Sequence, residues 1–187
     1  MTDHAKRPVV VFIAMSLDGY IADADGSIGW LSQVERAGED YGYHDFIATV
    51  DTVIMGRKTY EIVLGFGIPF PHADKRCFIL TRTPRAPEGS ITFTAGPVDT
   101  LIAQLRSEAG GTIFVDGGAE VIQSLQQCGG VDEYIISIIP VLLGGGTRLF
   151  TGPFAQQPLE NLGARRFDSG LVQLRYRVLH NERGNSQ

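Results

Sequence analysis

The chain has 187 residues, of which 43% are hydrophobic and 20% charged, and its formal net charge is −5. This length suits one domain, expected over 1–187 with a core at about 8–180 and flexible tails. The negative charge argues against a nucleic-acid binder, because such binding depends on neutralising phosphates. No run reaches the ~18 apolar residues of a membrane span, and the start MTDHAKR lacks the apolar stretch of a signal peptide, so we expect a cytoplasmic protein without a membrane partner.

The predicted elements, in chain order, alternate between strands and helices. The apolar, β-branched run at 9–15 is typical of a strand covered on both faces, and the glycine- and aspartate-rich stretch at 16–30 is typical of a long loop. After it we expect a helix, two strands, a helix, a strand, a helix and a strand, at 34–50, 52–55, 77–80, 97–105, 112–115, 118–127 and 133–139.

The last two predicted elements, 159–167 and 171–179, are joined by a three-residue Asp-Ser-Gly turn and predict an antiparallel hairpin. Strands that alternate with helices and end in a hairpin indicate a mixed sheet with a parallel centre. The sequence therefore predicts an α/β fold.

The two cysteines, Cys77 and Cys128, lie far apart in the sequence and form no Cys-x-x-Cys motif. Neither a cysteine-ligated metal site nor a redox-active pair of cysteines is indicated, and no metal site is predicted. Both are expected as small residues of the core.

Three predicted strands end in residues that suit phosphate. At Gly56 a small residue permits a tight turn, and the helix start after it offers free backbone N–H groups. The second strand leads into hydroxyls and an arginine, and Pro84 prevents its continuation. At the third, Gly117 and Gly118 let the backbone approach a ligand closely. The polar residues at the first two ends are Arg57, Lys58, Thr59, Thr81, Arg82 and Thr83.

Ligands of open α/β sheets lie beyond the carboxyl ends of the parallel strands. Each of the three ends alone has a plainer interpretation, since a Gly-Gly pair often makes only a tight turn and an Arg-Lys pair a solvated helix end. Together they predict a site for several separated phosphates, and NADPH fits because its 2′-phosphate and its pyrophosphate lie apart. Neither the Gly-x-Gly-x-x-Gly motif nor the spacing of a Walker motif occurs, which argues against an ordinary Rossmann dinucleotide-binding domain and against an ATPase.

Five motifs in order, MSLDGYIADADGSIGW, DTVIMGRKTYE, LTRTP, FVDGGAEVIQSL and PVLLGGGTRLF, resemble the dihydrofolate-reductase-like superfamily. The resemblance is specifically to bacterial proteins built on the RibD C-terminal domain of riboflavin biosynthesis, and it covers about 9–179. It implies a central, mostly parallel sheet of about eight strands flanked by helices, with NADPH across its carboxyl edge. Members of this family are often homodimers, so a homodimer is expected.

The resemblance also implies cofactor contacts. Ala14 and the loop 18–28, which includes Ile21, match the part that closes over the nicotinamide, and such a glycine-rich polar loop suits a gating lid. The other implied contacts are the phosphate segment Gly56, Arg57, Lys58 and Thr59, the adenosine and 2′-phosphate segment Leu80, Thr81, Arg82 and Thr83, and the pyrophosphate turn Val115, Gly117, Gly118, Ala119 and Glu120.

Three aspartates are candidate catalytic residues. In dihydrofolate reductases one acid on the first helix binds the pterin, and counting back from IMGR brings that position to Asp40, with Asp45 further on. Both could grip the N–H groups of a substrate or relay a proton, although this charged stretch also fits a solvated helix start. Asp18, at the end of the first strand, is the third candidate, and an aspartate before glycine also shapes turns.

Trp30, His44 and Arg148 are the predicted substrate contacts. Trp30 lines the substrate cleft or fills the core. His44 suits a pocket wall or a helix surface better than a base. Arg148 follows the glycines at 144–146 either as a cation for a substrate anion or as part of a plain turn.

Two departures from the related families bear on the substrate. The strand threonine that supports the acid in folate reductases corresponds to Ile136, whose side chain cannot form a hydrogen bond. The first-strand lysine of the riboflavin enzymes has no counterpart in VVVFIAM. The sequence predicts an NADPH-dependent reductase of a small heterocycle, with 5-amino-6-(5-phosphoribosylamino)uracil reductase as the nearest activity. The alternatives are a dihydrofolate or dihydropteridine reductase and a non-catalytic NADPH-binding module.

Overall fold

The computed structural model describes residues 6–83 and 85–180. Its strands are β1 Val9–Ser16, β2 Tyr20–Ala22, β3 Val50–Gly56, β4 Arg76–Leu80, β5 Ile91–Thr94, β6 Thr112–Gly117, β7 Glu133–Ile139, β8 Thr147–Arg148, β9 Leu159–Arg166 and β10 Val172–Val178. Its helices are the 3₁₀ helix η1 Gly29–Val34 and the α-helices α1 Tyr43–Ala48, α2 Arg57–Leu64, α3 Val98–Ser107 and α4 Ala119–Gln127. Apart from Lys6 and the buried Arg7, the predicted flexible tails lie outside the described residues, as does Pro84.

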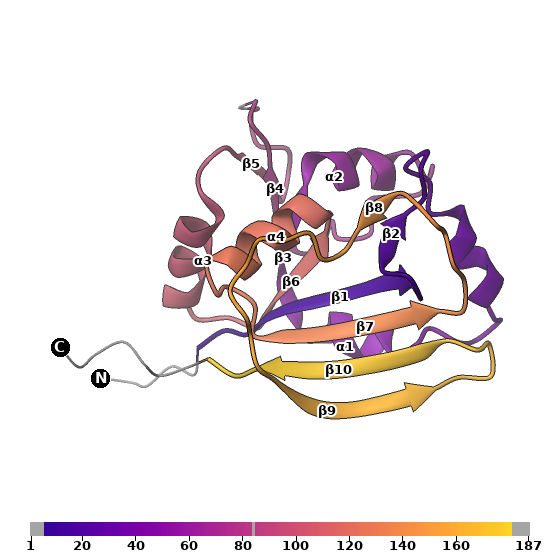
Figure 1. Cartoon of the computed structure of the whole chain (residues 1–187). Helices are drawn as coiled ribbons and strands as arrows, with labels where there is room; N and C mark the ends of the chain where they lie inside the picture. The colour runs from indigo at the N-terminus through magenta and orange to yellow at the C-terminus, as the bar shows by residue number, and fades with distance from the viewer. Residues whose placement is uncertain (1–5, 84, 181–187) are drawn as a thin grey trace.

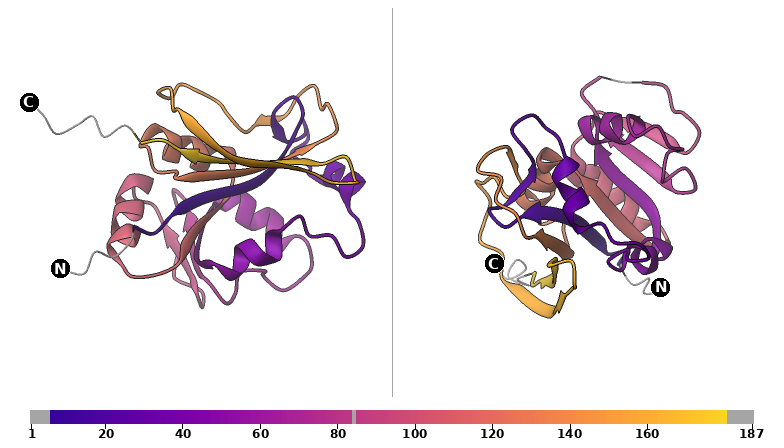
Figure 2. Two further views of the ribbon diagram at one scale, coloured as in Figure 1. Left: turned by 90° about the horizontal axis from the view of Figure 1, so that it is seen from below. Right: turned by 90° about the vertical axis from the view of Figure 1, so that its right-hand side faces the viewer.

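Eight strands form one sheet in the order β5-β4-β3-β6-β1-β7-β10-β9, and β2 pairs with β8 in a small second sheet (Figure 1). All pairs from β5 to β7 are parallel. The hairpin β9–β10 joins β7 in the antiparallel sense and lies along one edge of the molecule (Figure 2). The predicted α/β fold, with its parallel centre and closing hairpin, is confirmed.

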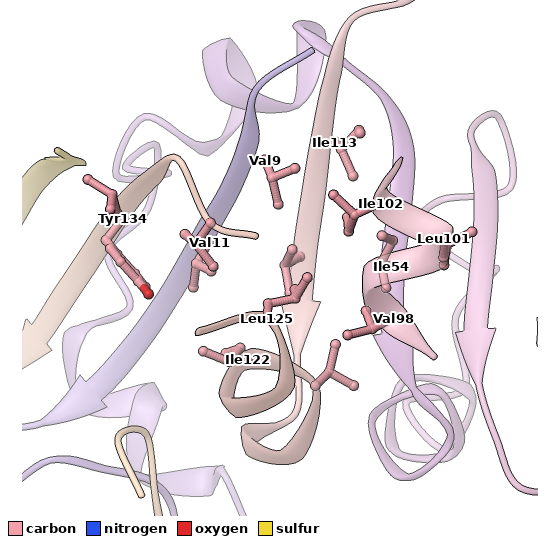
Figure 3. Close-up of a cluster of buried hydrophobic side chains, with 14 of the residues drawn as sticks. Val9, Val11, Ile54, Val98, Leu101, Ile102, Ile113, Ile122, Leu125 and Tyr134 are labelled. Atoms are coloured by element: carbon pink, nitrogen blue, oxygen red, sulfur yellow. The ribbon is translucent and has the colours of Figure 1, made fainter. Parts of the chain in front are cut away.

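Apolar side chains cover both faces of the central strands. On one face α3 and α4 pack against β1, β3 and β6, and Figure 3 shows the side chains of this cluster, among them Val9, Ile54, Ile113 and Leu125. On the other face α1 brings aromatic residues against β3, β4 and β6. Because the strands are buried on both faces, their sequences are continuous apolar runs rather than alternating ones.

The predicted helix over 34–50 is wrong over most of its length. The chain makes η1 up to Val34, then an irregular segment, and α1 only from Tyr43. Gly38 and Gly42 both have φ 79° and Tyr41 has φ 57°, so three residues adopt the left-handed conformation that ends helices. These breaks leave α1 with six residues.

Four short elements, β2, η1, β5 and β8, were missed in the sequence. The edge strand β5 has four residues and follows a polar stretch, so it carries little periodic signal. The loop predicted over 16–30 contains β2 and the start of η1. Pro97 is the residue before α3 rather than its first helical residue.

Cys77 is buried, as predicted, whereas Cys128 is exposed, so its predicted core position is wrong. Cys128 follows the last turn of α4, where the helix leaves the sheet. Burial raises the pKa of the Cys77 thiol to about 12. Within 6–83 and 85–180, none of the helices has both the length and the hydropathy of a bilayer-spanning segment.

Candidate functional site

The three phosphate-suited strand ends meet at one edge of the sheet. Strands β4, β3 and β6 are neighbours, and their parallel register places Gly56 opposite Leu80 and Met55 opposite Gly117. Residues that are distant in the sequence thus form a continuous carboxyl edge, where ligands of open α/β sheets bind.

The turns that start α2 and α4 pack against each other at this edge. A Cβ atom on Gly118 would lie 3.2 Å from Thr59 Oγ1, and one on Gly56 would lie 3.3 Å from Val121 Cγ2. Gly117 has φ 120°, a conformation that favours glycine. At the surface, Lys58 Nζ lies 3.9 Å from Glu120 Oε1, and both side chains are exposed. Glycine at these positions therefore permits the close approach of two helix starts.

Both helix starts leave backbone N–H groups without side-chain caps from the described residues. Helix N-termini of this kind bind anions through N–H groups and through the helix dipole. The Arg57 side chain is less available to bind an anion, because its Nη1 donates to both carboxylate oxygens of Glu61 at 2.6 and 2.8 Å. The combination of Cβ-free turns and uncapped N–H groups fits a pyrophosphate.

The predicted 2′-phosphate segment follows β4. Thr81 extends the sheet through its backbone N–H, which donates to the Thr94 carbonyl at 2.9 Å. Its hydroxyl accepts the backbone N–H of Thr83 at 3.1 Å and shapes the turn. Arg82, between them, is exposed. The Arg82 guanidinium and Thr83 are thus the parts of this segment that are open to solvent.

Asp18 holds the end of β1 against a distant loop. Its carboxylate accepts hydrogen bonds from Ser16 Oγ at 2.6 Å and from the backbone N–H groups of Leu143 and Gly144 at 3.1 and 2.8 Å. These bonds, the one from Ser16 first, lower the pKa of Asp18 to about 2. A carboxylate this acidic stays ionised near neutral pH, which favours the turn-shaping interpretation over proton donation.

The loop after β1 is tied down through β2 and β8. Tyr20 pairs with Arg148, and the Leu149 N–H donates to the Gly19 carbonyl at 2.9 Å. The Arg148 guanidinium lies 4.6 Å from the centroid of the Tyr20 ring, a cation–π contact. Ile21 packs against the margin of the α3–α4 core cluster. The predicted lid and the predicted substrate cation therefore belong to one small sheet.

Asp40 and Asp45 lie apart from the glycine turns. Asp40 accepts the backbone N–H groups of Gly42 and His44 at 2.9 and 2.8 Å, and so caps the start of α1; the bond from His44 first, these lower its pKa. The side chains of His44 and Asp45 are 87% and 100% exposed. Asp45 lines a 420 Å³ cavity with residues from the amino ends of β1, β6 and β7, such as Val10.

The structure supports the core interpretation of Trp30, one of the two that the sequence left open. The ring packs against a cluster that includes Ala14, Ile139 and Phe167. Its indole nitrogen is buried and has no hydrogen-bond partner within the described ranges. Trp30 thus fills the core next to Ala14, the predicted nicotinamide contact.

Three residues on the α1 side of the sheet were missed in the sequence. Asp116 immediately precedes Gly117, and its Oδ2 lies 3.2 Å from Nε2 of the buried His72. Burial, and then the charges of Asp116 and Asp74, raise the pKa of Tyr43 to about 12. The motif VDGG contains Asp116 and could have indicated it, but no spacing links it to His72 or Tyr43.

The comparisons with known proteins agree with this fold. The uncharacterized protein YwjB of Bacillus subtilis (strain 168) is 42% identical over 172 residues, which cover 91% of this chain and 98% of the relative. A solved structure from Shewanella sp. PV-4 with a provisional riboflavin-biosynthesis name is 31% identical, with a TM-score of 0.85 over 92% of this chain and 99% of that one. Dihydrofolate reductase from Enterococcus faecalis, solved with NADP(H), is 16% identical, with a TM-score of 0.63 over 92% of this chain and 97% of the reductase, and shows likeness of fold.

The family model of the RibD C-terminal domain matches residues 7–173, nearly all of the chain. This match spans the parallel sheet, both helix starts at its carboxyl edge and the β2–β8 pair. The chain belongs to the RibD C-terminal domain family.

Proposed function

We propose that this protein is an NADPH-dependent reductase that transfers a hydride to a C=N or C=O bond of a small heterocycle. The nearest substrate is 5-amino-6-(5-phosphoribosylamino)uracil, in keeping with the RibD C-terminal family. The observation that carries this proposal is the meeting of three strand ends and two uncapped helix starts at one edge of the sheet.

The described residues offer a separate partner for each anionic part of the cofactor. The N–H groups at the starts of α2 and α4 suit the pyrophosphate, since Gly56, Gly117 and Gly118 leave room beside them. The exposed guanidinium of Arg82 suits the 2′-phosphate through charge-assisted hydrogen bonds. When bound, NADPH supplies the hydride.

We place the reacting end of the site beside Ala14, on the α1 face of β1, above the cavity that Phe12 and Phe46 share with Asp45. Phe12 and Ala14 alternate onto this face, and the Phe12 ring stacks on Phe46 at 4.9 Å between centroids and meets Tyr43 edge-on at 5.7 Å. These aromatic side chains offer an apolar surface on which a flat ring can pack. Their role is therefore to orient a heterocycle rather than to react with it.

The test has two parts, binding and turnover. NADPH and NADP are titrated into the protein by calorimetry, and the absorbance of reduced nicotinamide is then followed with a panel of pyrimidines and pterins. We expect NADPH binding and oxidation with a member of the pyrimidine group. Oxidation with dihydrofolate or a dihydropteridine alone identifies the folate-type alternative, and binding without turnover on the whole panel identifies the non-catalytic module.

We also propose a homodimer, on the basis of the family resemblance. Light scattering on the purified protein should give twice the mass of one chain. A mass near that of a single chain contradicts the dimer and leaves the reductase proposal intact.

A further inference from the structure

The carboxyl end of β6 brings an acid to the cofactor edge. Along β6, Ile113 and Val115 point into the α3–α4 cluster, whereas Phe114 points to the α1 side. Asp116 lies on the same side as Phe114, because the His72 ring contacts both residues. Asp116 is the last residue before the Gly117–Gly118 turn, and its side chain is 23% exposed. A partly open carboxylate thus stands where the substrate side and the cofactor side of the edge meet.

A buried imidazole holds this carboxylate in place. The His72 side chain is 3% exposed, and its Nε2 lies 3.2 Å from Asp116 Oδ2. Phe70 and Phe114 meet the ring edge-on, at centroid distances of 5.6 and 5.9 Å. The aromatic packing restricts the ring, so the bond fixes the direction of the carboxylate.

The other ring nitrogen of His72, Nδ1, determines whether Nε2 donates or accepts in the hydrogen bond with Asp116. His72 Nδ1 is buried and has no hydrogen-bond partner among the residues that the structure describes. A proton there would be a buried donor without an acceptor, which is costly. The neutral ring with its proton on Nε2 avoids this cost, and Nε2 then donates to Asp116 Oδ2. Within the described ranges Asp116 Oδ1 accepts no hydrogen bond, so it remains available to a ligand.

The other candidate acids differ from Asp116 in this respect. Asp18 accepts three hydrogen bonds and Asp40 accepts two backbone N–H groups. Asp45 is fully exposed, and Asp74 is 69% exposed and paired with Lys75 at 3.0 Å. Among these five aspartates, Asp116 combines partial burial, a fixed orientation and an unused carboxylate oxygen.

The surroundings strengthen an interaction at Asp116. Tyr43, Phe12 and Phe114 form an aromatic wall on the same side, with Tyr43 and Phe114 6.4 Å apart. The Tyr43 hydroxyl stays protonated near neutral pH, because its pKa is raised to about 12. In such a partly apolar setting, hydrogen bonds between a carboxylate and N–H donors are stronger than in water.

We propose that Asp116 is the acid that binds adjacent N–H groups of the substrate ring, and that His72 is its positioning residue. This inference rests on the proposed reductase function and names the group that selects its substrate. The chemical class it selects is a flat heterocycle with two neighbouring N–H donors, such as an aminopyrimidine. It assigns to β6 the role that the sequence had assigned to Asp40 or Asp45.

The test uses 2,4-diaminopyrimidine as the probe, because its N1-protonated form presents a ring N–H and a neighbouring amino N–H to one carboxylate. Its binding is measured by calorimetry with and without NADPH, and 2,4-dimethoxypyrimidine, which has no N–H group, is the matched ligand control. Asp116→Asn should weaken the probe about 10–100-fold and leave NADPH affinity within about twofold. Asp74→Asn removes a neighbouring exposed carboxylate and is the matched charge control.

His72 is tested separately with two variants. His72→Leu should weaken the probe about 10-fold, whereas His72→Gln, which keeps an amide N–H in reach of Asp116, should restore most of the affinity. A role in folding alone would lower the melting temperature in both variants and would not distinguish the probe from NADPH.

Several outcomes overturn the inference. They are a wild-type protein that binds NADPH but not the probe, an Asp116→Asn variant that binds the probe as tightly as the wild type, and an equal loss in Asp74→Asn. Failure of NADPH to bind the wild type contradicts the reductase proposal instead, and probe binding in the absence of NADPH still decides the role of Asp116.

Discussion

Asp18 and Arg82 lie at the two sides of the carboxyl edge, beyond β1 and β4, and they differ in their hydrogen bonds. The Asp18 carboxylate is held by three donors from the fold. Arg82 is exposed, beside a turn that Thr81 and Thr83 shape without it. The first residue is therefore expected to matter for stability and the second for ligand binding.

Replacing Asp18 with asparagine should lower the melting temperature by a few degrees at pH 7. The native pKa of Asp18 is lowered from 3.8 to about 2, so the stabilisation is complete above pH 3.8 and is lost as the pH falls through about 2. Thermal melts at pH 7 and pH 3 should show a smaller difference between wild type and variant at the lower pH. Asp25→Asn in the same loop is the control, and a pH-independent difference would contradict this account.

Replacing Arg82 with alanine should weaken NADPH about 10–100-fold, because a charge-assisted phosphate contact contributes roughly 1.5–3 kcal/mol. NADH lacks the 2′-phosphate and should change little. Calorimetric titration of both cofactors measures the difference. Arg177→Ala removes an exposed arginine from β10 and should affect neither cofactor, whereas an equal loss of both in Arg82→Ala would exclude the 2′-phosphate role.

At the scale of elements, the pairing of β2 with β8 depends on a close backbone approach. A Cβ atom on Gly146 would lie 2.1 Å from the Ala22 carbonyl oxygen, and Gly146 has φ 123°. Gly145, next to it, has open space around its Cβ position. A side chain therefore fits at Gly145 but not at Gly146.

Gly146→Ala should lower the free energy of unfolding by about 1–3 kcal/mol, because the new methyl group separates β2 from β8 or strains the turn. Gly145→Ala should stay within about 0.5 kcal/mol of the wild type. Urea denaturation of both variants measures the difference. Equal free energies of unfolding for the two variants would show that the β2–β8 pair accommodates the methyl group without loss of stability.

The whole molecule is organised by one continuous sheet with an apolar layer on each face. Leu125 of α4 is fully buried in the layer against β1 and β6 (Figure 3). Because every central strand shares both layers, loss of packing in one of them should be felt throughout the sheet. We therefore expect a single cooperative unfolding transition.

Leu125→Ala should lower the free energy of unfolding by about 2–5 kcal/mol, since it removes buried methyl groups and leaves a cavity. The urea midpoint should fall with little change in the slope m. Gln127→Ala, on the exposed side of the same helix, should change stability by less than about 0.5 kcal/mol. A loss below about 1 kcal/mol in Leu125→Ala would indicate that α4 repacks against the sheet.

Much of the fold and part of the site followed from the sequence. Strand β7 has the predicted bounds, and the ends of the predicted β3, β4 and β6 come close to the observed ones. The helix over 34–50 could not be predicted correctly, because Tyr41 adopts a left-handed conformation that its type rarely takes. Similarly, the exposure of Cys128 depends on where α4 leaves the sheet.

The sequence by itself determined the α/β class, the order of the longer strands and helices and the three phosphate-suited strand ends, because apolar runs and glycine turns are local signals. The tertiary structure decided which of those ends are neighbours and which acids keep an unused oxygen. Asp116 and His72 are 44 positions apart, and only the pairing of β6 between β3 and β1 brings this acid to the site edge. Long-range contacts of this kind arise when the sheet assembles, and no local pattern encodes them.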